Sequence, residues 1–330
     1  MGRERTALLT ATSVACAVFI SAGSVAANQL EASLGGKIAF GALYNDGANG
    51  GESGPEFLRD GEFFFKAKGQ LDNGLQIEGR VELEGFTATD QIDENWVRLR
   101  SDFGEVLIGG DDTAADKHRE GWFGPPEKII GYFNSDISDF EPSTEGDDIS
   151  VRYTTPRIRG FQAAVSYGID GTDGGGDAGR VTEAAGPDDI ISVGASYRGE
   201  FGPVAMRIGG GYVTVEGDPF STWTIGGEFY VADVGPGELG LAVHYDDNGS
   251  DGEDAIITGG LQYEFGPWTV AGGTTRELST GTGNQTYAAW VSYALAPGVT
   301  AVFGYEGNNI EDPGIDSFDN IVGAYIDLQF

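Results

Sequence analysis

In the segment Leu75–Phe86, LQIEGRVELEGF, two kinds of residue alternate from Leu75 to Gly85. Polar side chains, most of them charged, occupy every second position, and aliphatic residues or glycine lie between them. A period of two indicates a β-strand, because successive side chains of a strand point to opposite faces of the sheet. One face of this strand is apolar and the other is charged. What surrounds each face decides the fold class.

The same alternation recurs along the chain in segments of roughly 9 to 13 residues, a length that suits tilted strands that cross a membrane. No stretch has the period of a long amphipathic helix. We predict sixteen strands, near residues 30–44, 61–71, 75–86, 93–100, 104–110, 148–155, 159–169, 189–199, 204–216, 221–231, 238–246, 255–264, 268–277, 285–294, 299–308 and 318–330.

The predicted connections fall into two classes that alternate along the chain. One class is short: 72–74, 101–104, 156–159, 200–203, 233–238, 265–267 and 296–298. The other is mostly longer and rich in Gly, Asp and Asn: 45–60, 87–92, 111–147, 170–188, 217–220, 246–254, 278–284 and 309–317. A soluble sandwich gives its two ends no reason to differ, whereas an outer-membrane barrel has short periplasmic turns and long external loops.

We therefore predict an all-β fold, a sixteen-stranded antiparallel transmembrane β-barrel in the outer membrane of a Gram-negative bacterium. The apolar strand faces then look out to lipid and the charged faces look into a watery lumen. Closure of the barrel satisfies every backbone hydrogen-bonding group, which a sheet in lipid requires.

The first residues have the layout of a secretory signal peptide. Arg3 and Arg5 precede an apolar run, and small residues end at Ala27. We predict a signal peptide over 1–27 and one barrel domain over 28–330. Cys16 is the only cysteine, so the mature chain contains no disulfide. The formal net charge of −33 repels nucleic acid and attracts cations.

Several segments resemble the general bacterial porins, the trimeric outer-membrane channels. Residues 94–117, ENWVRLRSDFGEVLIGGDDTAADK, resemble that family's strand-turn-strand before its constriction loop, and residues 150–168, SVRYTTPRIRGFQAAVSYG, resemble its next hairpin. The closing strands, with the terminal Phe330, are also similar. The family often has Arg-Gln where this chain has Gly110-Asp111, so a basic residue expected at the constriction is missing.

The resemblance implies that residues 111–147 form a third loop that folds into the pore, and that the protein is a homotrimer. The segment's apolar residues, such as Trp122 and Phe123, would let it pack against a wall. A solvated acidic surface loop is the alternative. The acidic residues assigned to the pore constriction are Asp111, Asp112, Asp116, Glu120, Asp136 and Asp139.

Basic residues gather on one face of three consecutive strands and form the predicted cationic pore wall: Lys66, Lys68, Arg80, Arg98 and Arg100. Pairing across the turn at 72–74 places Lys66 beside Arg80 and Lys68 beside Glu78. Like charges side by side are unfavourable in a sheet. A pore wall that faces an acidic loop explains them, with a transverse field across the water between. Solvated charges paired with nearby glutamates are the alternative.

These features predict a passive diffusion channel for small hydrophilic solutes and ions, with a preference for cations. Phe330 would serve as the signal by which the last strand engages the barrel-assembly machinery. The alternatives are a solute-specific channel on the same barrel and an exported acidic β-sandwich that binds glycans or calcium.

The sequence does not predict an enzyme. It contains neither a G-x-S-x-G elbow nor a P-loop, and its histidines, His118 and His244, have no nucleophile beside them in sequence. No cofactor is required. Calcium could bind at the acidic loops 170–179 and 246–254, although neither completes an EF-hand.

Overall fold

A computed structural model describes residues 30–46, 53–86, 92–121, 123–125, 149–168, 189–215, 221–247, 255–278, 284–312 and 315–330. The predicted signal peptide, 1–27, lies outside these ranges. Sixteen strands are present: β1 Glu31–Asn45, β2 Gly54–Gln70, β3 Gln76–Glu84, β4 Ile92–Ser101, β5 Gly104–Gly110, β6 Ile149–Thr154, β7 Phe161–Gly168, β8 Ile190–Phe201, β9 Val204–Val215, β10 Ser221–Val234, β11 Gly237–Asp247, β12 Ala255–Phe265, β13 Trp268–Glu277, β14 Gln285–Ala296, β15 Val299–Asp312 and β16 Ile315–Gln329. Within the described ranges, no helix is long and apolar enough to cross a membrane.

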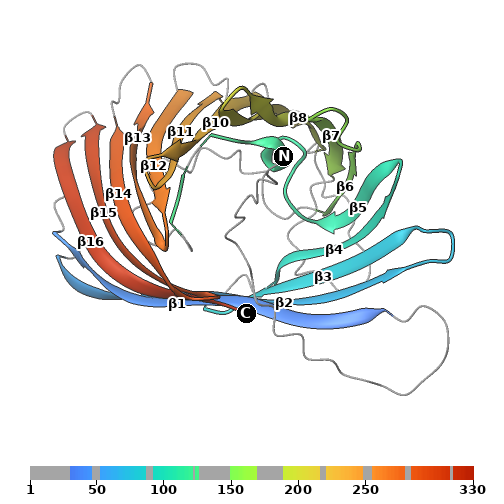
Figure 1. Cartoon of the computed structure of the whole chain (residues 1–330), viewed down its shortest axis with the longest axis horizontal. Helices are drawn as coiled ribbons and strands as arrows, with labels where there is room; N and C mark the ends of the chain where they lie inside the picture. Colours follow the sequence, from blue (N-terminus) through green and yellow to red (C-terminus); the bar gives the residue numbers. More distant parts are fainter. Residues whose placement is uncertain are drawn as a thin grey trace, which may run out of the picture.

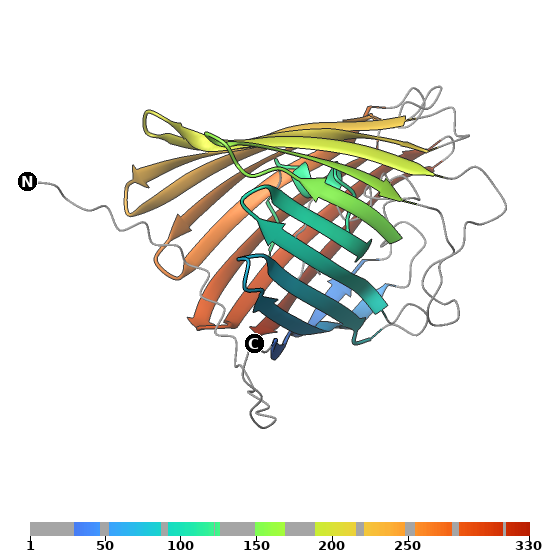
Figure 2. The same cartoon turned by 90° about the vertical axis from the view of Figure 1, so that its right-hand side faces the viewer.

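The strands form one closed antiparallel barrel, which confirms the predicted fold class. Each strand pairs with its neighbours in sequence, and β16 pairs with β1 to complete the ring (Figure 1). The strands are strongly tilted (Figure 2), as closure of a sheet into a barrel requires. Because the ring is closed, the described sheet has no edge strand.

The predicted short turns are confirmed, and they lie between the strands of seven hairpins. In the turn between β2 and β3, Gly74 has φ 84°, a left-handed conformation that glycine adopts without the steric cost of a side chain. Two of the predicted longer connections, 45–60 and 309–317, are much shorter in the structure. Residues 54–60 belong to β2, and β15 and β16 extend to Asp312 and back to Ile315. The ladders with β1 and between β15 and β16 continue there although the sequence no longer alternates clearly.

The two faces of the wall differ as the alternation predicts. Large apolar side chains on the outside are exposed, among them Phe40, Val97, Ile108 and Val165. Many of the buried side chains are polar, including Ser192, Thr275 and Thr286. The usual arrangement of a soluble protein is therefore inverted, as in a barrel with a lipid-facing outside and a polar inside.

The predicted register of the basic strands is also confirmed. Lys66 lies opposite Arg80 and Lys68 lies opposite Glu78 on β2 and β3. The period of two then places these four side chains on the same, lumen-facing side of the sheet.

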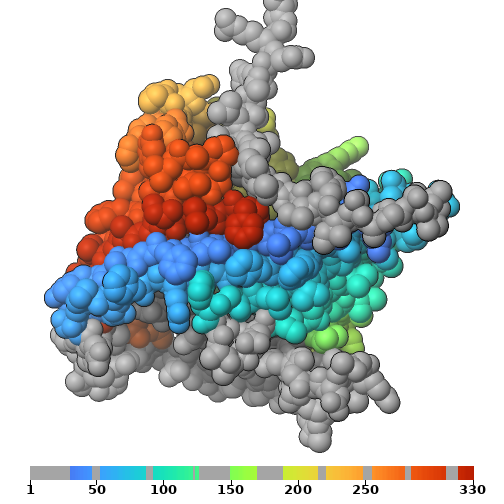
Figure 3. All heavy atoms as spheres, turned by 90° about the horizontal axis from the view of Figure 1, so that it is seen from below, coloured from blue at the N-terminus to red at the C-terminus, as the bar shows by residue number. Residues whose placement is uncertain are grey.

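The seam between β1 and β16 depends on the last residue of the chain. Phe330 and Gly36 exchange two backbone hydrogen bonds, each 3.0 Å long. The ring of Phe330 also lies 6.2 Å from that of Phe63 on β2. Figure 3 shows the outer surface at this seam, with β16 against β1 and β2 beyond it.

Deletion of Phe330 should lower the amount of folded barrel recovered in the outer membrane, because it removes both hydrogen bonds to Gly36 and leaves backbone groups of β1 unpaired. Such groups cost several kcal/mol each where water is absent. Mobility of the unheated protein on a gel measures the folded fraction. Phe330→Leu, which keeps the backbone pair, is the matched control and should assemble better than the deletion. Equal recovery of the deletion variant and the wild type would contradict the closing role.

Candidate functional site

After β5 the chain turns into the interior of the ring (Figure 1). The structure describes residues 111–121 and 123–125 of the predicted constriction loop, including a short 3-10 turn, η1, at Asp116–His118. Asp136 and Asp139, with the rest of the loop, lie outside the described residues. We call residues 111–121 and 123–125 the inner segment.

Serine hydroxyls on the inner wall hold the start of the inner segment. The backbone N–H of Ala114 donates to Ser166 Oγ of β7 at 3.0 Å, and the N–H of Ala115 donates to Ser192 Oγ of β8 at 2.7 Å. Ser166 and Ser192 are buried. The segment therefore satisfies its backbone groups on the wall, as buried peptide groups require.

His118 continues this contact one turn later. Its Nδ1 lies 2.8 Å from Ser196 Oγ, and only 3% of the residue is exposed. Burial, and then the positive charges of Arg157, Arg152 and Arg198, lower the pKa of His118 to about 4. The imidazole is thus neutral at neutral pH and acts as a packing and hydrogen-bonding group.

His244, on β11, anchors the end of the described segment. Its Nδ1–H donates to the backbone oxygen of Glu120 at 2.7 Å, and its Nε2 lies 2.8 Å from Asp246 Oδ2 and 3.0 Å from Thr224 Oγ1. Asp246 also receives Arg119 from the inner segment, at 3.3 Å. The structure places His244, 3% exposed, on the inner wall under the segment.

Glycines on β8, β9 and β10 allow the segment to approach the wall closely. A Cβ atom at any of three glycines would overlap a backbone oxygen of the segment: Gly194 against Ala114, Gly209 against His118, and Gly226 against Glu120. We call these wall residues the docking track: Ser166, Ser192, Ser196, Gly194, Gly209 and Gly226.

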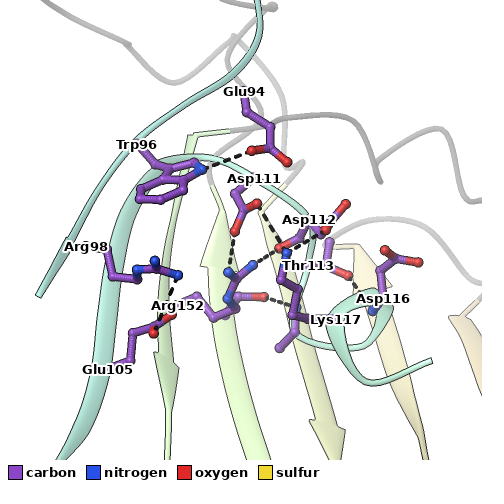
Figure 4. Close-up of polar contacts among 12 residues, drawn as sticks. Glu94, Trp96, Arg98, Glu105, Asp111, Asp112, Thr113, Asp116, Lys117 and Arg152 are labelled. Atoms are coloured by element: carbon purple, nitrogen blue, oxygen red, sulfur yellow. Dashed lines mark hydrogen bonds and ion pairs between the residues drawn. The ribbon is translucent and has the colours of Figure 1, made fainter. Parts of the chain in front are cut away.

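Asp111 and Asp112 lie where the segment leaves the wall of the barrel (Figure 4). Asp111 is buried and pairs with Arg152 of β6, which also donates to the backbone oxygen of Asp112. Lys117 Nζ lies 3.0 Å from Asp112 and 3.5 Å from Asp111. These carboxylates therefore have cationic partners inside the site.

Asp116 and Glu120 are also paired. Arg119 lies 2.9 Å from Asp116, and Arg198 of β8 lies 2.9 Å from Glu120. The sequence reasoning missed Arg152 and Arg198. Arg152 alternates correctly for a lumen position in SVRYTT, which is the signal that could have found it.

The predicted basic wall lies on β2, β3 and β4, and glutamates partly neutralise it. Arg98 pairs with Glu78 at 2.7 Å, and Arg100 pairs with Glu105 at 2.6 Å. For Arg98 and Arg100, these ion pairs favour the alternative interpretation, in which solvated charges pair with nearby glutamates.

Arg80 and Lys66 of the same wall face each other across β3 and β2, and only Arg80 has carboxylate partners among the described residues. Arg80 contacts Glu82 and lies 3.2 Å from Glu94. Lys66 lies over the ring of Phe64, 4.3 Å from its centroid, and has no ion pair among the described residues.

Two groups of carboxylates are close enough to share a cation. Glu94, Asp111 and Asp112 place oxygens within 4.8 Å of one another, as do Glu62, Glu84 and Asp93. Lys117, Arg152 and Arg80 already pair with the three carboxylates of the first group. Of the loops predicted to bind calcium, 170–179 lies outside the described residues, and 248–254 does as well.

Comparison with known proteins gives one clear family. A sequence profile described as Gram-negative porin matches residues 11–312. An anion-selective porin from Comamonas acidovorans aligns with a TM-score of 0.65 at 14% identity over 92% of this chain and 100% of that one. A triple mutant of the Rhodopseudomonas blastica porin gives 0.62 at 17% identity over 91% and 100%. No curated protein sequence matches the chain.

Gly226→Ala should loosen the inner segment, because the added methyl group would overlap the Glu120 oxygen and crowd His244. Overpacking of this kind costs about 1–3 kcal/mol. Limited trypsin digestion of the detergent-solubilised protein measures the effect as faster cleavage after Lys117 and Arg119. The control is Gly168→Ala, where the nearest atom would lie at 3.6 Å. Equal cleavage of both variants would mean that the track does not hold the segment.

Proposed function

The chain belongs to the Gram-negative porin family, and on that premise we propose that it is an outer-membrane diffusion channel for small hydrophilic solutes and ions. Proteins of this family and fold are channels rather than enzymes. They need no cofactor for diffusion. In this proposal the two histidines, His118 and His244, serve to dock the inner segment and have no part in a reaction.

The observation that carries this proposal is the inner segment inside a polar-lined ring. A closed sixteen-stranded barrel encloses a lumen wide enough for an aqueous channel. The inner segment occupies part of this lumen against β6–β11, as its bonds to Ser166, Ser192 and His244 require. We infer that residues 111–147 narrow the channel and set the size limit for solutes.

We propose a moderate preference for cations. The net charge of −33 makes the channel mouths negative. Within the inner segment, Asp112 is the carboxylate most open to the lumen, with 40% of its side chain exposed. All four described carboxylates of the segment have cationic partners, but the side chains of Asp111 and Glu120 are also buried, so they contribute less to the field in the lumen than those of Asp112 and Asp116.

The opposite preference is the second candidate, because Lys66 lies on the inner wall without an ion pair among the described residues. One of the structurally similar porins is anion-selective. Fixed charges near the narrowest point therefore decide the sign of the selectivity.

We further propose that the protein is a homotrimer and that β16, ending at Phe330, is the strand that the assembly machinery recognises. Both proposals follow from the resemblance to porins. A solute-specific channel on the same barrel is the main alternative to general diffusion.

The zero-current potential under a KCl gradient tests the proposed selectivity. Fixed charges act over about 10 Å at ~0.1 M salt and about 3 Å at ~1 M. We therefore expect a cation-selective potential at low mean salt that becomes smaller at high salt. An anion-selective potential at low salt would refute the cation preference. It would support the second candidate, in which Lys66 on the inner wall sets the selectivity.

A charge-removing pair of substitutions locates the source. Asp112→Asn with Asp116→Asn should shift the potential towards neutrality, because both side chains are partly open to the lumen. Asp111 is left intact, since it is buried against Arg152. Asp102→Asn, in the turn between β4 and β5, is the matched control and should shift the potential less.

A further inference from the structure

A cavity of about 390 Å³ opens from the inner wall at the short-turn end of β1–β4. This volume lies in the range of small-molecule sites. Its charged lining residues are Glu31, Lys68, Glu78, Arg98 and Arg100, and its amide side chains are Gln70 and Gln76. None of the described residues of the inner segment lines it.

The charges in this cavity alternate in sign across neighbouring strands. Glu31 of β1 lies opposite Lys68 of β2, Lys68 lies opposite Glu78 of β3, and Glu78 lies opposite Arg98 of β4. Neighbouring strands are about 4.8 Å apart. The row therefore presents negative and positive groups at short, regular intervals to anything that lies along the wall.

Two of these charges are open for a ligand. Glu78, the carboxylate opposite Lys68 on β3, forms an ion pair with Arg98 at 2.7 Å. Among the residues that the structure describes, neither Lys68 nor Glu31 has an ion pair, and both are exposed on the lumen side. The open pair is thus one ammonium group beside one carboxylate.

We propose that this cavity is a binding subsite for zwitterionic solutes of the α-amino acid class. The solute carboxylate pairs with Lys68 and the solute ammonium pairs with Glu31, while its side chain lies towards Gln76 and Arg100. The proposal rests on the channel function, since the solute reaches the cavity through the lumen.

The balance of charge favours a zwitterion over a simple anion. Arg98 and Arg100 are cations, but Glu78 and Glu105 pair with them at 2.7 and 2.6 Å. An anion would meet one open cation and, beside it, the open carboxylate of Glu31. A zwitterion satisfies both, and an opposite charge near each group is favourable.

Three probes that share the glutamine side chain test the charge requirement. L-Glutamine is a zwitterion, N-acetyl-L-glutamine is an anion and L-glutaminamide is a cation at neutral pH. Saturation-transfer difference NMR on the detergent-solubilised protein measures binding without any need for conduction, and the reduction of KCl current in a planar bilayer measures occupancy of the channel. We expect glutamine to give the strongest signal in both measurements.

Single substitutions place the site. Lys68→Gln and Glu31→Gln should each raise the half-saturating concentration of glutamine roughly two- to fivefold, the change expected for loss of one exposed ion pair. Glu238→Gln, on β11 near the same end of the barrel, is the control and should leave it unchanged.

The outcomes separate the subsite from the channel. Full KCl conductance without glutamine binding would overturn the subsite alone, whereas absence of conductance would count against the channel function. Stronger binding of the acetylated probe would show a simple anion site, and equal binding of all three probes would show a size effect. Either result would overturn the proposal.

Discussion

The need to satisfy every backbone group of a sheet in lipid governs this structure. Sixteen strands meet that need only when β16 returns to β1, and the bonds between Phe330 and Gly36 complete the ladder at its end. Closure then fixes which side of each strand faces in. Many charged and hydroxyl side chains are buried on the lumen side, and the exposed large apolar side chains, such as Phe40 and Val97, face outwards.

A polar inner wall makes it possible to dock a segment inside the barrel. The inner segment has peptide groups that must be paired, and the wall offers serine hydroxyls and His244 at the right places. Glycines such as Gly226 let the backbone approach. The ion pairs of Arg152 and Arg198 then neutralise carboxylates that would otherwise repel one another. The same alternation along the strands thus serves both purposes: apolar residues form the outer face of the barrel, and small polar residues and glycines on the inner face bind the segment.

The strands and the short turns of the barrel could be predicted from the sequence, because alternation and turn length are local properties. The register of Lys66 with Arg80 followed from one turn, and the structure has it. The strand ends at Gly54 and Asp312 could not be predicted, since pairing with a neighbour extends them where alternation fails.

The wall residues that contact the inner segment could not be predicted from the sequence, for a different reason. Asp111 meets Arg152 from 41 residues away, and His244 meets Glu120 from 124 residues away. Such contacts depend on the path of the segment across the lumen, which no local pattern encodes. Small residues at inward positions of β8, β9 and β10 were the available sign: Ser192, Gly194, Ser196, Gly209, Gly211 and Gly226.

The most direct measurement of the central claim is the single-channel conductance of a variant in which a short Gly-Ser link replaces residues 120–138. If the loop narrows the channel from inside, conductance rises and larger sugars pass in liposome swelling, while the unheated protein still migrates as a folded barrel. Unchanged conductance in a folded variant would place the loop outside the conducting path and contradict the account.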